Sequence, residues 1–137
     1  MGNQNVIILN EKVIKTFKSK TTYERELMIY KNNLSYTPKL IGYDNLLKQI
    51  IIERINGIPL VKIPIKIREK YYIKAKELYY KFYEDTSYYL YDYHAGNIML
   101  NELNQLILID FEFIGQEKKI KHRKGIESFL NKINVIN

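Results

Sequence analysis

The sequence predicts an α+β fold: a small antiparallel sheet with one helix comes first, and a reduced helical part that carries a β-hairpin follows. Three observations predict this order. Residues 1–60 hold short apolar runs between turn residues, residues 64–86 place apolar side chains at helical spacing, and two apolar runs flank a polar turn between residues 98 and 109. Such runs are typical of strands and of an amphipathic helix. The 137 residues suffice for a core but are few for two lobes.

Four strands are predicted in the first part. Val6–Leu9 and Lys12–Phe17 are apolar runs joined by an Asn-Glu turn, and Lys15 lies in the second of them. Two more strands are predicted at Pro38–Asp44 and Gln49–Leu60, the latter with a glycine- and proline-punctuated exit. Taken alone, Lys15 is equally well explained as a solvated lysine on a strand.

Two helices are predicted. The first opens at Thr21 and Thr22, where a threonine is the candidate N-cap, and it carries Glu24 and Glu26 in its first turns. The second is one long helix from Pro64 to Thr86. Its core-facing stripe is predicted to consist of Tyr71, Ala75, Leu78 and Phe82, flanked by Tyr72, Tyr79 and Tyr83.

The most informative stretch is Asp92-Tyr93-His94-Ala95-Gly96-Asn97, followed thirteen residues after Asn97 by Asp110. Between Asn97 and Asp110 lie the two apolar runs of the predicted hairpin, so both side chains should emerge at one end of the same ribbon. Aspartates also begin turns and end strands for purely structural reasons. The chain has only four aspartates, however, and two of them stand at these positions.

These residue types suit phosphoryl transfer. A transferring phosphoryl group spreads negative charge over its oxygens, so a catalyst must neutralise that charge and position the acceptor hydroxyl. Mg²⁺ prefers oxygen ligands and needs only one or two from the protein beside the phosphates, and Asn97 and Asp110 can supply them. Asp92 can orient an acceptor hydroxyl and take its proton. His94 is interpreted as support for the loop, because no second histidine stands at metal-ligand spacing.

Tyr91-Asp92-Tyr93-His94-Ala95-Gly96-Asn97-Ile98 and Leu108-Ile109-Asp110-Phe111-Glu112 resemble the catalytic loop and metal-binding motif of the protein-kinase-like superfamily. The form D-x-H-x-G-N is similar to its atypical small branches: RIO kinases, the KEOPS-associated kinase, aminoglycoside phosphotransferases and lipopolysaccharide kinases. The resemblance implies a minimal protein-kinase-like fold, truncated at both ends, with residues 1–57 as the N-lobe and residues 58–137 as a reduced C-lobe.

The resemblance also implies roles for residues outside the motif. Lys15 would bind the α- and β-phosphates of ATP, paired by a helix glutamate for which Glu26 is preferred and Glu24 is the competitor. The main chains of Glu53 and Ile55 would hydrogen-bond the adenine. With Asn97 and Asp110 as Mg²⁺ ligands and Asp92 as the catalytic residue, the resemblance implies an ATP- and Mg²⁺-dependent phosphotransferase of the serine/threonine protein kinase type.

Several features depart from the ordinary protein-kinase pattern. Leu90 replaces the first histidine of the catalytic loop, and Glu112 replaces the glycine of D-F-G. No glycine-rich loop precedes Lys15, and only 25 residues follow Glu112, which leaves room for one short closing helix at Glu127–Val135. The alternative hypothesis is therefore a pseudokinase that binds nucleotide or a protein partner without turnover. A protein partner that completes the reduced lobe fits either hypothesis.

Composition limits the other classes of protein to which the chain could belong. Zero cysteines exclude disulfides and thiolate metal sites, and no run reaches the roughly 18 apolar residues of a membrane span, so a cytoplasmic location is expected. The net charge of +7 includes a basic cluster at residues 118–124, interpreted as a solvated loop and helix start in preference to a site for nucleic acid, anionic lipid or an acidic substrate. An unrelated basic nucleic-acid-binding domain would leave the Asp92, Asn97 and Asp110 spacing unexplained. The substrate is expected to be a protein or a small hydroxylated molecule.

Overall fold

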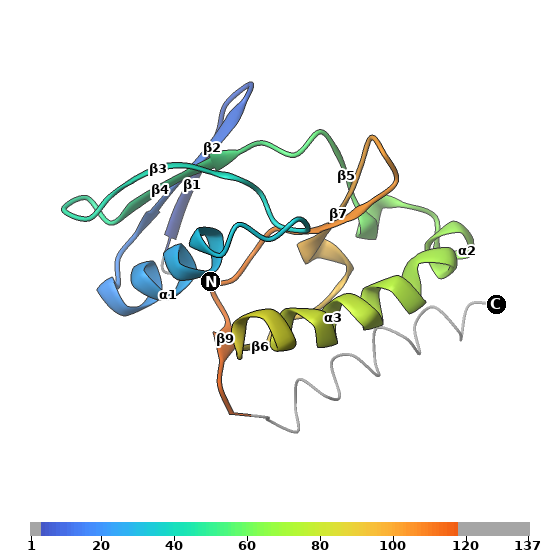
Figure 1. The fold of residues 1–137 in the computed structure, drawn as a ribbon. Coiled ribbons are helices and arrows are strands. Elements are labelled where there is room, and N and C mark those ends of the chain that lie inside the picture. Colours follow the sequence, from blue (N-terminus) through green and yellow to red (C-terminus); the bar gives the residue numbers. More distant parts are fainter. Residues whose placement is uncertain (1–3, 118–137) are drawn as a thin grey trace. The chain divides into compact units, whose positions relative to one another are not determined.

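The computed structural model of the chain describes residues 4–117 (Figure 1). The basic cluster at residues 118–124 and the closing helix predicted at Glu127–Val135 lie outside the described residues. The chain divides into two compact units, Met1–Asn56 and Gly57–Asn137, with the residue pair Asn56 and Gly57 at the boundary. Within the described part, no helix is both long and apolar enough to cross a membrane.

The first unit is a four-stranded antiparallel sheet with one helix on it. The sheet has the order β1-β2-β4-β3, and its elements are β1 (Gln4–Ile8), β2 (Lys12–Phe17), α1 (Lys20–Lys31), β3 (Leu40–Asp44) and β4 (Gln49–Glu53). The isoleucines and valines of these strands favour extended backbone because they pack well on a pleated surface. Ile50 and Ile52 of β4 are buried on the face of the sheet that also carries Lys15. The predicted sheet and helix are thus confirmed.

Helix α1 begins earlier than predicted. Ser19 is the N-cap, and its Oγ accepts a hydrogen bond from the backbone N of Thr22 at 3.3 Å. The predicted threonine cap is therefore wrong, and no acidic residue lies in the first turn. A serine whose backbone is extended can cap the first turn in this way, so the helix begins two or three residues earlier than a threonine cap would allow.

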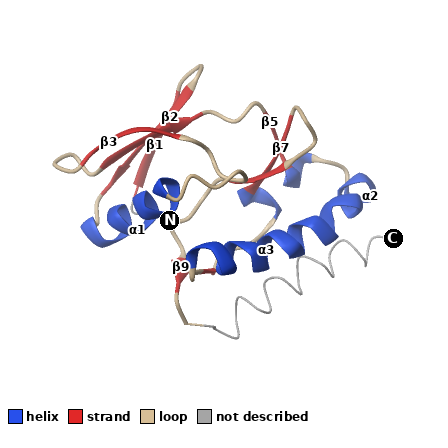
Figure 2. Ribbon diagram, in the orientation of Figure 1, coloured by secondary structure: helices blue, strands red, loops and turns tan. Residues whose placement is uncertain are grey.

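The second unit combines short strands with helices, as Figure 2 shows by colour. In chain order its elements are β5 (Gly57–Pro59), η1 (Leu60–Lys62), α2 (Ile65–Arg68), η2 (Glu69–Tyr71), α3 (Tyr72–Thr86), β6 (Tyr89–Leu90), η3 (Ala95–Asn97), β7 (Ile98–Asn101), β8 (Leu106–Leu108) and β9 (Ile114–Gly115). Strands β5, β7 and β8 form an antiparallel sheet, and β6 pairs with β9. The predicted hairpin is confirmed as β7 and β8.

The single helix predicted from Pro64 to Thr86 is wrong in its first third. Pro64 is the N-cap of the short α2, a 3₁₀ turn follows it, and α3 begins only at Tyr72. Tyr71 has ψ near −5°, which turns the chain between the two helices. Side-chain periodicity continues across such a turn, because its residues keep a helical hand, so the pattern alone does not reveal it.

Helix α3 anchors the segments that carry the motif. Ala75 and Phe82 are fully buried, and the Phe82 ring stacks on that of Phe111 with centroids 5.4 Å apart. The hydroxyl of Tyr93 donates a hydrogen bond to the backbone oxygen of Ala75. Burial raises the pKa of Tyr93, so its hydroxyl stays protonated as a donor. Tyr93 follows Asp92 and Phe111 follows Asp110, so each of these contacts holds the backbone beside a motif aspartate against α3.

Candidate active site

A buried ion pair joins β2 to α1 in the first unit. Lys15 Nζ lies 2.7 Å from Glu26 Oε2, and the two side chains are only 6% and 0% exposed. Glu24, the competing partner, is exposed to solvent. Glu26 is therefore the residue that pairs with Lys15, because the helix turns Glu26 toward the sheet and Glu24 away from it.

Tyr30 is a third member of this cluster that the sequence did not indicate. Lys15 Nζ donates to the Tyr30 hydroxyl at 3.1 Å, and that hydroxyl donates to Glu26 Oε2 at 3.0 Å. Glu26 and Tyr30 are four residues apart, so α1 places them on the same face. From this four-residue spacing, Tyr30 could have been predicted to lie beside Glu26. Its hydroxyl adds hydrogen bonds to a buried pair, which is where such bonds matter most.

The buried pair leads to a stability prediction. Replacing Glu26 with leucine leaves the Lys15 ammonium buried without its partner, so the free energy of unfolding should fall by about 3–5 kcal/mol. Adding Lys15→Met in the same chain should restore most of that loss, since no uncompensated charge remains. The measurement is urea unfolding followed by circular dichroism.

Glu24→Leu is the matched control, because Glu24 is an exposed glutamate on the same helix. It should change the free energy of unfolding by no more than about 0.5 kcal/mol. An equal loss for Glu24→Leu and Glu26→Leu would contradict the assignment of the pair.

The two positions predicted to bind adenine lie at the end of this unit. Glu53 is the last residue of β4, where its side chain accepts a hydrogen bond from the backbone N of Lys39 at 2.9 Å. Ile55 follows in the segment that leads to Gly57. Their backbone roles toward a nucleotide remain predictions.

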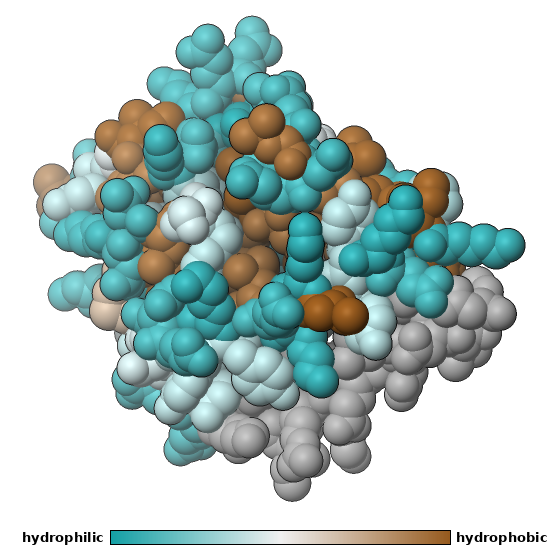
Figure 3. Space-filling view, turned by 45° about the vertical axis from the view of Figure 1, so that its right-hand side comes forward, coloured by the Kyte–Doolittle hydropathy of each residue, from teal (hydrophilic) through white to brown (hydrophobic). Residues whose placement is uncertain are grey.

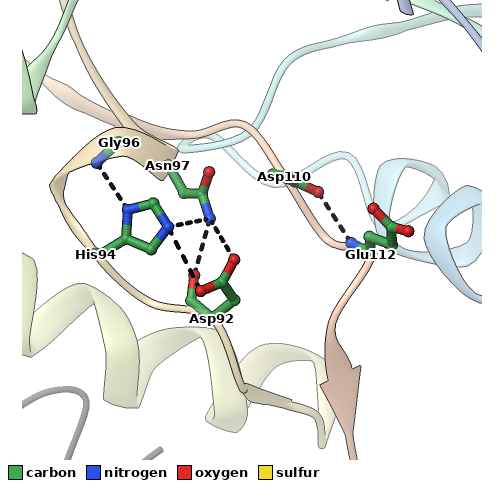
Figure 4. Close-up of polar contacts among 6 residues, drawn as sticks. All are labelled: Asp92, His94, Gly96, Asn97, Asp110 and Glu112. Atoms are coloured by element: carbon green, nitrogen blue, oxygen red, sulfur yellow. Dashed lines mark hydrogen bonds and ion pairs between the residues drawn. The ribbon is translucent and has the colours of Figure 1, made fainter. Parts of the chain in front are cut away.

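The second unit brings Asp92, His94 and Asn97 together in one loop (Figure 4). Asn97 Nδ2 donates to the backbone oxygen of Asp92 at 2.8 Å and lies 3.4 Å from its Oδ2. Because the amide nitrogen is used in this way, Asn97 Oδ1 points away from Asp92, as the close-up shows. The Asp92 side chain is half exposed, so its carboxylate stays accessible to a solute.

His94 supports this loop through both ring nitrogens. Its Nδ1 accepts a hydrogen bond from the backbone N of Gly96 at 3.0 Å, so the proton of the neutral ring belongs on Nε2. Nε2 lies 3.4 Å from Asp92 Oδ1 and 3.3 Å from Asn97 Nδ2. These contacts agree with the supporting role predicted for His94, since the ring is held by the backbone and faces the aspartate.

Asp110 leaves the hairpin at the end where Asn97 enters it. Ile98 pairs with Leu108, and the backbone N of Ile109 donates to the oxygen of Asn97 at 3.2 Å. Asp110 Oδ1 accepts a hydrogen bond from the backbone N of Glu112 at 3.1 Å, which fixes the orientation of the carboxylate. The shared ribbon end predicted for Asn97 and Asp110 is thus present.

The donor set fits Mg²⁺ better than a metal held by the protein alone. Across residues 4–117, no cluster of three or more histidine, cysteine or acidic side chains could hold a metal ion. Mg²⁺ does not need such a cluster, because it keeps several waters and takes only one or two protein oxygens beside phosphates. Asn97 Oδ1 and a carboxylate oxygen of Asp110 are hard oxygen atoms of the kind that Mg²⁺ prefers.

The described fold is similar to solved structures of WbdD. The crystal structure of monomeric WbdD matches with a TM-score of 0.68 and 14% identity over 96% of this chain. That of "the bifunctional kinase-methyltransferase WbdD" matches with a TM-score of 0.66 and 14% identity, again over 96%. The fold is kinase-like. This chain covers 37% and 34% of those two chains, or about a third of their length.

A third match is the complex of WbdD with the kinase inhibitor LY294002, with a TM-score of 0.62 and 15% identity over 96% of this chain and 35% of that chain. No protein-family model matches the sequence, and no curated protein matches it either. The similarity to these solved structures supports the kinase-like fold. The RIO, KEOPS-associated, aminoglycoside phosphotransferase and lipopolysaccharide kinase branches named above stay a prediction.

Proposed function

We propose that this kinase-like chain is an ATP- and Mg²⁺-dependent phosphotransferase that transfers the γ-phosphate to a hydroxyl. The observation that carries the proposal is the loop in which Asn97 and His94 both contact Asp92 while Asp110 stands at the same hairpin end. A half-exposed carboxylate held on two sides is suited to receive a proton from a bound hydroxyl. The kinase-like neighbours support transfer as the class of reaction.

Each residue has a distinct role in this proposal. Asp92 positions the acceptor hydroxyl and accepts its proton. Lys15, held by Glu26, orients the α- and β-phosphates, and the main chains of Glu53 and Ile55 hydrogen-bond the adenine. Asn97 and Asp110 would hold Mg²⁺, which when bound neutralises charge on the phosphates.

The acceptor is proposed by analogy with the smallest kinase-like proteins. We infer a serine or threonine hydroxyl of a protein, with a small hydroxylated molecule as the other class, in a cytoplasmic setting. A protein partner that completes the reduced C-lobe would supply a substrate-binding surface.

One observation favours the alternative of a nucleotide-binding pseudokinase. The β1–β2 turn closes with the backbone N of Leu9 donating to the oxygen of Lys12 at 2.8 Å, and no glycine stands in it. Ordinary protein kinases cover the phosphates with a glycine-rich loop at this place. Weaker phosphate contacts would leave nucleotide binding without efficient turnover.

The proposed function is tested by binding and turnover together. At a Mg-ATP concentration about 100 times its Kd, binding should stabilise the protein by about 2.7 kcal/mol. This should raise the melting temperature by roughly 10 °C. Labelled γ-phosphate should also move to protein or to an added hydroxyl substrate. Stabilisation without transfer would favour the pseudokinase, and the absence of both would contradict the proposal.

A further inference from the structure

The loop of residues 45–48, which joins β3 to β4, exposes two adjacent leucines. Leu46 is 94% exposed and Leu47 is 58% exposed. Exposed apolar side chains are ordinary on protein surfaces, and Figure 3 shows many among hydrophilic ones on one face. Exposure alone therefore means little, and the surroundings of the two leucines decide whether they have a partner.

This loop is held rigidly by side chains. Asp44 Oδ1 accepts hydrogen bonds from the backbone N of Leu46 at 2.9 Å and of Leu47 at 3.0 Å. The Tyr23 hydroxyl donates to Asn45 Oδ1 at 2.7 Å. A backbone N–H that enters a water-poor layer without a partner is costly. Both leucine amides already have a partner, so burying these two N–H groups would not carry that penalty.

Lysines lie at the base of the loop, on the side of β2 and α1. The backbone N of Phe17 donates to the oxygen of Lys48, and Lys48 Nζ donates to the oxygen of Lys18, each at 2.9 Å. The loop thus lies at the end of the sheet where β2 passes into α1 (Figure 1), beside the exposed Lys18 and Lys20. Exposed apolar side chains next to several lysines form a surface suited to anionic lipid.

The charge balance at this end is positive. The cations at the base of the loop are Lys18, Lys20 and Lys48. Around Tyr23, which holds Asn45, the acidic side chains are Asp44 and Glu24, and both raise the pKa of Tyr23 after the larger effect of its burial. Three lysines against these two carboxylates leave a net positive charge, which attracts an anionic surface.

We propose that the loop of residues 45–48 docks on an anionic bilayer, with Leu46 and Leu47 in the headgroup boundary and the lysines against the lipid phosphates. The proposal is independent of the phosphotransferase function. Each lysine near an anionic surface contributes about a fivefold gain in partitioning. Neither the leucines nor the lysines alone suffice for stable anchoring, so the binding is reversible and needs both signals.

The second hairpin provides a matched control. Asn101 Oδ1 accepts hydrogen bonds from the backbone N of Leu103 at 3.0 Å and of Gln105 at 2.8 Å, so that loop is built in the same way. Leu103 is 76% exposed, but its neighbour is Glu102 and no lysine stands between residues 98 and 110. An exposed leucine on a rigid hairpin turn without cations should not bind anionic lipid.

The test is co-sedimentation of the full chain with vesicles of phosphatidylcholine alone or mixed with phosphatidylserine. Wild type should bind only the mixed vesicles, and less at high salt because the attraction is screened. Leu46→Ser with Leu47→Ser should weaken this binding at least about tenfold, whereas Leu103→Ser should match wild type. Because both serine variants keep every charge of the chain, a difference between them reports the leucines.

A second measurement locates the contact. The chain has no cysteine, so Leu46→Cys and Leu103→Cys can each carry one environment-sensitive dye. Mixed vesicles should shift the emission to the blue for the dye at 46 and leave the dye at 103 unchanged. Equal sedimentation of wild type and the Leu46/Leu47 variant, or equal shifts at both positions, overturns the proposal. The proposal is also overturned if the chain binds an acidic polypeptide but not the mixed vesicles.

Discussion

Asp92→Asn should lower the rate of phosphate transfer by about 10²- to 10⁴-fold while Mg-ATP still raises the melting temperature as in wild type. An asparagine fills the same space but cannot accept the proton of the acceptor hydroxyl. The loop should keep its conformation, because Asn97 Nδ2 donates to the backbone oxygen of Asp92 at 2.8 Å, which the substitution preserves. The measurement is transfer of labelled γ-phosphate under saturating Mg-ATP.

Asp85→Asn is the control for this substitution. Asp85 is an exposed aspartate on α3 whose contact with Lys81, at 3.7 Å, lies on the surface and contributes little to stability. Its loss should leave transfer unchanged. Equal rates for Asp92→Asn and wild type would remove Asp92 from the catalytic role.

The second large effect is expected at Asp110. Asp110→Ala should abolish the rise in melting temperature that Mg-ATP causes, because only one proposed ligand oxygen, that of Asn97, would remain for the metal. Without nucleotide the variant should lose only about 1 kcal/mol of stability, from the hydrogen bond that Oδ1 accepts from the backbone N of Glu112. Thermal melts with ATP in Mg²⁺ and in EDTA measure both quantities.

Asp110→Asn separates the two roles of this side chain. An amide oxygen can still accept the Glu112 hydrogen bond, so the stability without nucleotide should return toward wild type, while the loss of charge still weakens metal binding. If Asp110→Ala kept the full Mg²⁺-dependent rise, Asp110 would not be a metal ligand.

The motif region was predictable because its spacing is local. Two apolar runs around a polar turn define a hairpin, and the positions of Asn97 and Asp110 at its ends follow from that register. Lys15 and Glu26 lie eleven residues apart, and their pairing was implied by the resemblance to the kinase-like superfamily, with Glu24 left as the competitor. The helix boundaries were less predictable: Ser19 and the turn before Tyr72 depend on backbone conformations that apolar periodicity does not encode.

By itself the sequence determined the sheet, the helix, the hairpin and the spacing of three polar side chains, because each depends on periodicity and on neighbours along the chain. Only the tertiary structure decided that Lys15 pairs with Glu26 and not Glu24, that Tyr30 joins them, and that Tyr93 and Phe111 fix the motif to α3. The physical reason is that periodicity shows which face of an element is apolar. Which partner a buried polar group meets depends on how distant elements pack.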